Sequence, residues 1–204
     1  MTLEGGEGTG KSTQVRLLGE ALGARGLPVL LTREPGGSPG AELLRCLLLS
    51  EKASFSPQAE TLLHFAARAD HLARTIRPAL AAGSWVVCDR FFDSTMAYQG
   101  YGQGADRAEI ATLIGLVGPR PDLTVILDLP EDLAQARLAA RNGRPDRYEQ
   151  LGLAFHARVR AGFRAIAVAE PARCALVAAD GAKAEVHRRI MAVLRARLGL
   201  DGGA

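Results

Sequence analysis

The sequence has few aromatic residues, few cysteines and few lysines, and no apolar run long enough to cross a membrane. Aromatic residues make up 5% of the 204 residues and apolar residues 48%, so we expect an aliphatic core. No run approaches the roughly 20 apolar residues that a membrane-spanning helix needs. The cysteines stand far apart, without a CxxC pair or a Cys/His cluster, which argues against a disulfide framework and a zinc site. These cysteines are Cys46, Cys88 and Cys174.

Arginine carries almost all of the positive charge. Three lysines stand against 22 arginines, and the net charge is +3. Because the arginines lie among acidic residues on predicted helices, solvated helix faces explain them better than a nucleic-acid surface. Met1 is followed within a few residues by Glu4 and a glycine loop, without the apolar run of a signal peptide. We therefore expect a cytoplasmic protein that has neither a membrane nor a nucleic acid as its partner.

Short apolar runs alternate with amphipathic segments along the chain. The runs predict strands at 1–3, 29–32, 85–88, 124–129 and 174–178. The segments between them predict helices at about 11–25, 41–49, 57–81, 107–117, 131–141, 150–170 and 183–198. This alternation predicts an α/β fold, with a five-stranded parallel sheet and helices on both faces. Because ligands bind beyond the carboxyl ends of such strands, we expect residues 33–37, 89–90 and 128 to converge there.

Residues 5–12 match the phosphate-binding pattern GxxxxGK[ST] at every fixed position. The glycines allow backbone N–H groups to point at phosphate oxygens, and the following helix adds partial positive charge at its N-terminus. Lys11 is expected to reach the β- and γ-phosphates, and the Ser12 hydroxyl to bind Mg²⁺. The predicted ATP-binding residues are Gly5, Gly6, Glu7, Gly8, Thr9, Gly10, Lys11, Ser12 and Thr13.

A phosphate-binding loop alone is shared by kinases, GTPases, motors and DNA-processing enzymes. A guanine-selecting TKxD motif does not follow the strand predicted at 124–129, which counts against a GTPase. The chain also lacks the length of a motor with appended domains. A compact kinase with a second pocket for the phosphate acceptor is the best interpretation.

Three segments resemble signatures of the bacterial thymidylate kinases. Residues 4–14 read EGGEGTGKSTQ, residues 32–38 read TREPGGS, and residues 89–100 read DRFFDSTMAYQG. The similarity covers essentially the whole chain. It implies a P-loop NTPase fold in one domain, 1–204, with a short lid at about 141–148. It also implies a homodimer that phosphorylates dTMP to dTDP with ATP and Mg²⁺.

Arg90 and Glu7 are the residues expected at the acceptor phosphate and sugar. The Arg90 guanidinium would hold the acceptor phosphate and neutralise charge during transfer, the alternative being a local ion pair with Asp89. The resemblance implies that Glu7 accepts a hydrogen bond from the 3′-hydroxyl, and a helix-start carboxylate is the alternative. Asp89 is expected to help bind Mg²⁺ together with Ser12, and Asp128 is its rival for that role.

The helix expected from residue 57 carries His64, Arg68 and His71 on one face. The resemblance implies that Arg68 hydrogen-bonds the thymine base. The family's stacking phenylalanine stands four residues before that arginine, where this chain has His64, with Phe65 displaced by one position. One position turns a side chain about 100° around a helix, so either His64 or Phe65 faces the base.

The resemblance implies further contacts to dTMP. Tyr98 is expected to lie against the sugar, where the 2′-hydroxyl of a ribose would clash. Ser94 and Gln99 are expected to make polar contacts to the base. The predicted dTMP-binding residues are Glu7, Arg33, His64, Phe65, Arg68, Arg90, Ser94, Tyr98 and Gln99.

Residues 141–147 form a basic segment, punctuated by glycine and proline, that predicts a mobile lid between two helices. Some family members carry a catalytic arginine in the phosphate-binding loop, where this chain has Gly8. A lid arginine is therefore expected to supply the transition-state cation, worth about 10³–10⁵ in rate. Arg147 matches the family best, with Arg144 and Arg141 as alternatives. The predicted catalytic residues are Lys11, Arg90, Arg147, Arg144, Arg141 and Glu7.

Two other functions stay open at this point. The chain could phosphorylate another deoxynucleotide or a deoxynucleoside, because His64 departs from the family's pattern. It could also be a nucleotide-binding protein without kinase activity.

Overall fold

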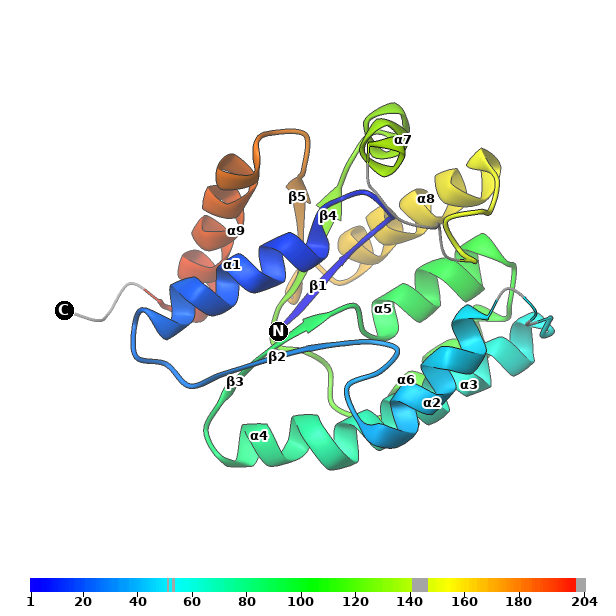
Figure 1. Cartoon of the computed structure of the whole chain (residues 1–204), viewed down its shortest axis with the longest axis horizontal. Coiled ribbons are helices and arrows are strands. Elements are labelled where there is room, and N and C mark those ends of the chain that lie inside the picture. Colours follow the sequence, from blue (N-terminus) through cyan, green and yellow to red (C-terminus); the bar gives the residue numbers. More distant parts are fainter. Residues whose placement is uncertain (51, 53, 141–146, 201–204) are drawn as a thin grey trace.

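The computed structural model describes residues 1–50, 52, 54–140 and 147–200. Within them lie the strands β1 (Thr2–Gly5), β2 (Val29–Arg33), β3 (Trp85–Asp89), β4 (Thr124–Asp128) and β5 (Cys174–Ala178). They form one parallel sheet in the order β2–β3–β1–β4–β5, which confirms the predicted α/β fold. β1 is the central strand and leads directly into the phosphate-binding loop (Figure 1).

Helices cover both faces of the sheet. The described part of the chain contains α1 (Lys11–Gly23), α2 (Pro39–Leu49), α3 (Pro57–His71), α4 (Arg77–Ala81), α5 (Phe92–Thr95), α6 (Arg107–Val117), α7 (Glu131–Ala139), α8 (Leu153–Ala169) and α9 (Lys183–Leu198), and the π-helical segments η1 (Leu72–Ile76) and η2 (Met96–Gly102). α1 and α9 lie side by side on one face, while α4, α5 and α8 contact the sheet from the other, and α2 packs on α3 (Figure 1). None of the described helices is long and apolar enough to span a bilayer.

The strands bury apolar side chains on both faces, as their near-continuous apolar sequences predict. Leu3, Val87 and Val125 pack into the cluster formed with α1 and α9. Val86 and Ile126, one position away from two of these, point into the clusters on the opposite face. Each such side chain contributes roughly 1.5–3 kcal/mol, so the sheet that carries the loops is held firmly from both sides.

Two helical regions differ from the prediction. The helix expected at 57–81 contains the wider turn η1 just before Pro78, which has no N–H group to donate. The segment after β3 is helical in α5 and η2, although its aromatic and glycine residues are poor helix formers. Tertiary packing explains this second helix, because Phe92 and Tyr98 are buried in the clusters beneath it.

Candidate active site

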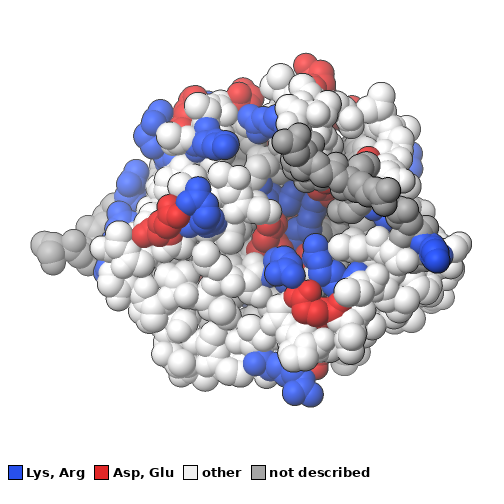
Figure 2. Space-filling model, viewed as in Figure 1, with Lys and Arg blue, Asp and Glu red and all other residues white. Residues whose placement is uncertain are grey.

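A cavity of about 780 Å³ lies at the carboxyl ends of the strands. The phosphate-binding loop lines it together with Arg33, Glu34, Asp89 and Arg90, which confirms that these two strand-end segments converge on the loop. Asp128 instead lines a separate small cavity beside the loop. Figure 2 shows the hollow in this face of the molecule, with basic and acidic side chains gathered inside it.

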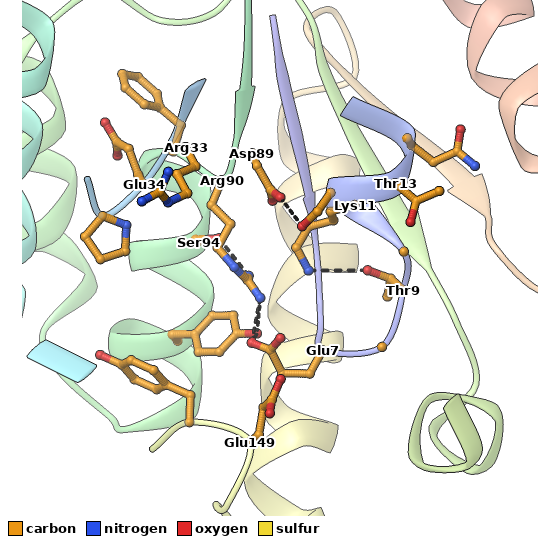
Figure 3. A pocket seen from close by; sticks show the side chains of 18 of the residues that line it. Glu7, Thr9, Lys11, Thr13, Arg33, Glu34, Asp89, Arg90, Ser94 and Glu149 are labelled. Carbon is orange, nitrogen blue, oxygen red and sulfur yellow. Dashed lines mark hydrogen bonds and ion pairs between the residues drawn. The ribbon is translucent and has the colours of Figure 1, made fainter. Parts of the chain in front are cut away.

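The phosphate-binding loop curls around the amino group of Lys11. Nζ donates to the carbonyl oxygens of Gly5 and Gly6, at 3.1 and 2.7 Å, and lies 3.4 Å from Thr9 Oγ1 (Figure 3). Burial and the nearby Arg90 lower the pKa of Lys11 to about 8, against the opposing effect of the loop carboxylate. The amine is therefore held in the loop, with weak carbonyl partners that phosphate oxygens would replace.

Ser12 and Asp89, which the sequence predicts as metal ligands, are hydrogen-bonded to each other. Ser12 Oγ donates to Asp89 Oδ2 at 2.6 Å, between the start of α1 and the end of β3. The rival carboxylate, Asp128, is held by Arg160 through two hydrogen bonds of 2.7 and 3.0 Å. Asp89 therefore contacts Ser12 of the phosphate-binding loop, whereas Asp128 is engaged by Arg160.

Arg90 lies between the loop and the rest of the cavity, and several groups fix its position. Its φ of +68° is left-handed, which is uncommon and strained for a residue other than glycine. Nη1 donates to Gly5 O at 3.0 Å and to Ser94 Oγ at 3.2 Å. Nη2 donates to Glu7 Oε1 at 2.5 Å and to Tyr98 Oη at 3.1 Å (Figure 3). Both terminal nitrogens of Arg90 are thus engaged by acceptors of the protein, which fixes the guanidinium beside the loop.

Glu7 is ionised at neutral pH in this setting. Burial alone would raise its pKa, but Arg90 and Lys11 outweigh burial and lower the pKa to about 2. Its Oε1 also accepts a hydrogen bond of 2.7 Å from the Tyr98 hydroxyl. Burial raises the pKa of Tyr98 well above its usual value, so Tyr98 remains a hydrogen-bond donor.

Gly8 leaves no room for a side chain. Its φ is +72°, and a Cβ atom would lie 2.7 Å from the carbonyl oxygen of Ala134 in α7. Position 8 of the loop therefore cannot carry an arginine side chain while α7 keeps its position. Two of the predicted lid arginines, Arg141 and Arg144, lie outside the described residues.

Arg68 of α3 also lines the cavity. Nε donates to Glu34 Oε2 at 2.8 Å, and Nη2 donates to Thr95 Oγ1 at 3.1 Å. Nη1 is buried and has no hydrogen-bond partner among the described residues. Since a guanidinium can only donate, Nη1 is left with unused donor capacity in this structure.

His64, rather than Phe65, lines the cavity. Its Nε2 lies 2.9 Å from Tyr148 Oη, and burial, aided by Arg68, lowers the pKa of His64 to about 3, so the ring is neutral. Phe65 is 3% exposed and packs in the hydrophobic core, with its ring centroid 4.8 Å from the Arg68 guanidinium. The alternative that Phe65 faces the base is therefore corrected: Phe65 supports Arg68 from the core side.

Three other predicted contact residues also line the cavity. Ser94 Oγ donates to the buried carboxylate of Glu4 at 2.5 Å. Gln99 is 1% exposed, which fixes its amide in place. Arg33 is exposed and pairs with Glu42 at 3.0 Å, so it is the most weakly held of the three.

Arg147 contacts α3 and not the phosphate-binding loop. Its Nη2 pairs with Glu60, a buried carboxylate that also accepts hydrogen bonds from Gln99 and from Tyr148, both at 2.9 Å. These contacts lower the pKa of Glu60, against the effect of burial. Arg147 would have to leave Glu60 before it could act as the predicted transition-state cation.

Several residues of the cavity were not predicted from the sequence. Arg137 of α7 and the segment around Lys183 and Val186 line the cavity together with the phosphate-binding loop. Glu34 also lines the cavity and holds Arg68, while Glu60 holds Arg147. Two features of the sequence could have pointed to them. Lys183 is one of only three lysines, and Glu34 and Glu60 lie in the segments that also contain the predicted contacts Arg33 and Arg68.

A phosphate-binding loop and several arginines that line one cavity are typical of a nucleotide-binding phosphotransferase. The thymidylate kinase family model matches residues 3–190 of the chain. The thymidylate kinase of Gluconobacter oxydans is 53% identical over 206 residues (99% of this chain, 96% of that protein), and that of Caulobacter vibrioides is 52% identical over 203 residues (98% and 97%). The crystal structure of a thymidylate kinase from Ehrlichia chaffeensis matches with a TM-score of 0.75 at 37% identity (95% of this chain, 96% of that chain). The chain therefore belongs to the thymidylate kinase family, as its sequence motifs predict.

Proposed function

We propose that this chain transfers the γ-phosphoryl group of ATP to dTMP and releases dTDP and ADP. The observation that carries this proposal is one cavity that Lys11, Arg90 and Arg68 line together. Two polyanions can meet only where fixed cations offset their repulsion, and Arg90 stands at that meeting point. The membership of the thymidylate kinase family supports dTMP as the acceptor.

The donor nucleotide would bind at the loop. Its β- and γ-phosphates would take the place of the carbonyl oxygens that now contact Lys11. Ser12 and Asp89 fit Mg²⁺, because a hydroxyl and a carboxylate are hard oxygen donors and stand 2.6 Å apart beside the loop. The ion bound there would neutralise charge on the phosphates. Arg137 and Lys183 would lie along the nucleoside of ATP.

The acceptor nucleotide would bind between Arg90 and Arg68. Arg90 would hold its phosphate, Glu7 would accept a hydrogen bond from its 3′-hydroxyl, and Tyr98 would lie against its sugar. A phosphate monoester is already an anionic nucleophile, so the chain needs no strong base. Its task is to place the two phosphates in line and to offset their charge.

The base would lie at the far end of the cavity. The unpaired Nη1 of Arg68 would donate to a carbonyl oxygen of thymine, and the neutral ring of His64 would stack on the base. Ser94 and Gln99 would add polar contacts, and Arg33 would contribute from the edge of the cavity.

A lid arginine would supply the transition-state cation, since the loop cannot carry one at Gly8. Arg147 is the first candidate by sequence, with Arg144 and Arg141 as alternatives. For Arg147 this role requires that it exchange Glu60 for the transferring group.

Turnover of dTMP, dUMP, dCMP and dGMP with MgATP, measured as ADP release, tests this function. We expect the highest kcat/KM for dTMP. A clear preference for another nucleotide would assign the chain to a different acceptor. ADP release that no nucleotide stimulates would assign it to the proteins that bind nucleotides without kinase activity.

We also propose that the chain forms a homodimer through α2 and α3. Leu43, Leu47 and Leu62 are 74%, 45% and 51% exposed on these adjacent helices, and a second copy of the chain would cover them. Light scattering should give twice the mass of one chain, and Leu43→Glu should give the mass of one. A monomeric wild-type protein would contradict this interface.

We further propose that residues 1–204 form one domain with a lid at about 141–148, working in the cytoplasm without nucleic acid as a partner. A single cooperative unfolding transition and recovery in the cytoplasmic fraction of cells are the expected results. Two separate transitions would contradict the single domain.

A further inference from the structure

The guanidinium of Arg68 is fixed in one orientation. The residue is 3% exposed, and its Cζ lies 4.8 Å from the ring centroid of Phe65 and 5.2 Å from that of Phe91. Glu34 binds Nε and Thr95 binds Nη2, which leaves Nη1 as the unpaired donor. A side chain held on its faces and along two of its edges cannot turn to follow a ligand.

A chain of hydrogen bonds fixes the carboxylate that holds Arg68. Glu34 Oε1 lies 3.0 Å from Nδ1 of His71, which is fully buried. His71 Nε2 lies 2.7 Å from the hydroxyl of Thr32 on β2. Because a carboxylate only accepts, Nδ1 of His71 carries a hydrogen and donates it to Glu34. Thr32, His71 and Glu34 therefore join the sheet to Arg68; we call them the Thr32–His71–Glu34 chain.

The backbone leaves room for this chain at one glycine. Gly37 has a φ of +85°, and a Cβ atom there would lie against His71 Nε2 and 2.5 Å from Thr32 Oγ1. The hydrogen bond between Thr32 and His71 occupies the space that any side chain at position 37 would take. The TREPGG segment thus supplies the hydroxyl of Thr32, the carboxylate of Glu34 and the space at Gly37. Helix α3 supplies His71 and Arg68.

We propose that the Thr32–His71–Glu34 chain positions Arg68 so that the acceptor site selects a base with a carbonyl oxygen over one with an amino group at the same place. This inference rests on the proposed function, in which Arg68 contacts the base. Cytosine carries an amino group where thymine carries a carbonyl, so its N–H would meet the N–H of Arg68. Two buried donors facing each other both lose their hydrogen bonds, which a site built for a carbonyl penalises strongly.

The positioning of Arg68 matters because a fixed donor discriminates and a mobile one does not. If Glu34 were free to shift, Nη1 could move away from the amino group of cytosine and the penalty would fall. The contact to thymine would lengthen at the same time, and displacements of about 1 Å can cost about 100-fold in rate. Loss of the chain should therefore weaken dTMP and relax the preference for it.

The experiment compares Thr32→Val, which keeps the shape and removes the hydroxyl, with Thr32→Ser, which keeps the hydroxyl. Thr32→Val should lower kcat/KM for dTMP about 10-fold, mainly through KM, and lower the ratio of kcat/KM for dTMP over dCMP about 10-fold. The KM for ATP should stay unchanged, and Thr32→Ser should restore most of the ratio. His71→Asn, which can still donate to Glu34 but not reach Thr32, should change the ratio in the same direction.

Ser38→Ala is the matched control. The buried Ser38 donates to Asp70 of α3 at 2.6 Å, so its loss removes a hydrogen bond between the same parts of the fold without touching Arg68 or its partners. Its dTMP-over-dCMP ratio should equal that of the wild type. An unchanged dTMP-over-dCMP ratio in both Thr32→Val and His71→Asn would overturn the proposal, and so would an equal fall of this ratio in Ser38→Ala. In either case, turnover of dTMP by the wild type would still uphold the proposed function. A wild type that does not turn over dTMP would refute both.

Discussion

Replacing Gly37 by alanine tests how tightly the base end of the site is built. Both backbone groups of Gly37 are engaged: its N–H donates to Glu42 at 2.8 Å, and its carbonyl accepts from Thr75 at 2.7 Å. The residue cannot shift without breaking one of these bonds. The added methyl group must therefore displace His71 or Thr32, or strain the backbone at a φ of +85°.

The cost has two parts. A left-handed backbone costs an alanine about 1–2 kcal/mol, and forcing a methyl group into a filled space costs about 1–3 kcal/mol. Together they should lower the free energy of unfolding by about 2–5 kcal/mol, which urea denaturation at neutral pH measures directly. For a chain of this size that corresponds to a fall in Tm of roughly 4–20 °C. Displacement of His71 should also raise the KM for dTMP more than the KM for ATP.

Gly83→Ala separates the two parts of the cost. Gly83 also has a left-handed φ, +77°, but a Cβ atom there would meet nothing within 4 Å. It should cost only the backbone strain, about 1–2 kcal/mol, and leave the KM for dTMP unchanged. Equal destabilisation by Gly37→Ala and Gly83→Ala would refute the reasoning, because it would mean that His71 and Thr32 yield freely to the new methyl group.

The charged groups of the site give three more expectations. Because Lys11 has a pKa of about 8, kcat/KM for ATP should fall as pH rises above 8 and the amine loses its proton; a flat profile between pH 7 and 9 would contradict this. Asp89→Asn should raise the Mg²⁺ concentration for half-maximal rate about 10-fold, measured by titration with MgCl₂, and an unchanged value would remove Asp89 from the metal site. Arg147→Ala should lower kcat about 10³-fold with little change in nucleotide affinity. Glu60→Gln, which removes the charge that Arg147 pairs with, should keep most of kcat. Equal losses of kcat in the two variants would mean that Arg147 acts only by holding Glu60.

The sheet could be predicted because its strands are short apolar runs buried on both faces, and that property is visible in the sequence. The helix in the segment that follows β3 could not. Phe92 and Tyr98 favour other conformations locally, and they become helical because the clusters beneath them bury their rings. In this segment, which carries the Arg90 partners Ser94 and Tyr98, tertiary packing therefore outweighs the local conformational preference.

The site divides in the same way. Residues proposed to meet phosphate, such as Lys11 and Arg90, lie in motifs whose spacing reflects their chemistry. The carboxylates that hold the arginines are far from them in the chain: Glu34 and Arg68 are 34 residues apart. Their pairing depends on how β2 and α3 pack together. A buried carboxylate needs a cation, but the sequence alone does not identify which of 22 arginines provides it.

The displacement of the aromatic residue on α3 shows how one position changes the chemistry of the base end. His64 faces the cavity, and Phe65, about 100° around the helix, enters the core beneath Arg68. Burial keeps His64 neutral, with a pKa of about 3, so its ring can stack on a base without adding charge beside Arg68. Unlike a phenylalanine, His64 has a ring nitrogen that needs a hydrogen-bond partner, and its Nε2 lies 2.9 Å from Tyr148 Oη. Tyr148 in turn donates to the buried carboxylate of Glu60, so the partner of the imidazole is itself held in place.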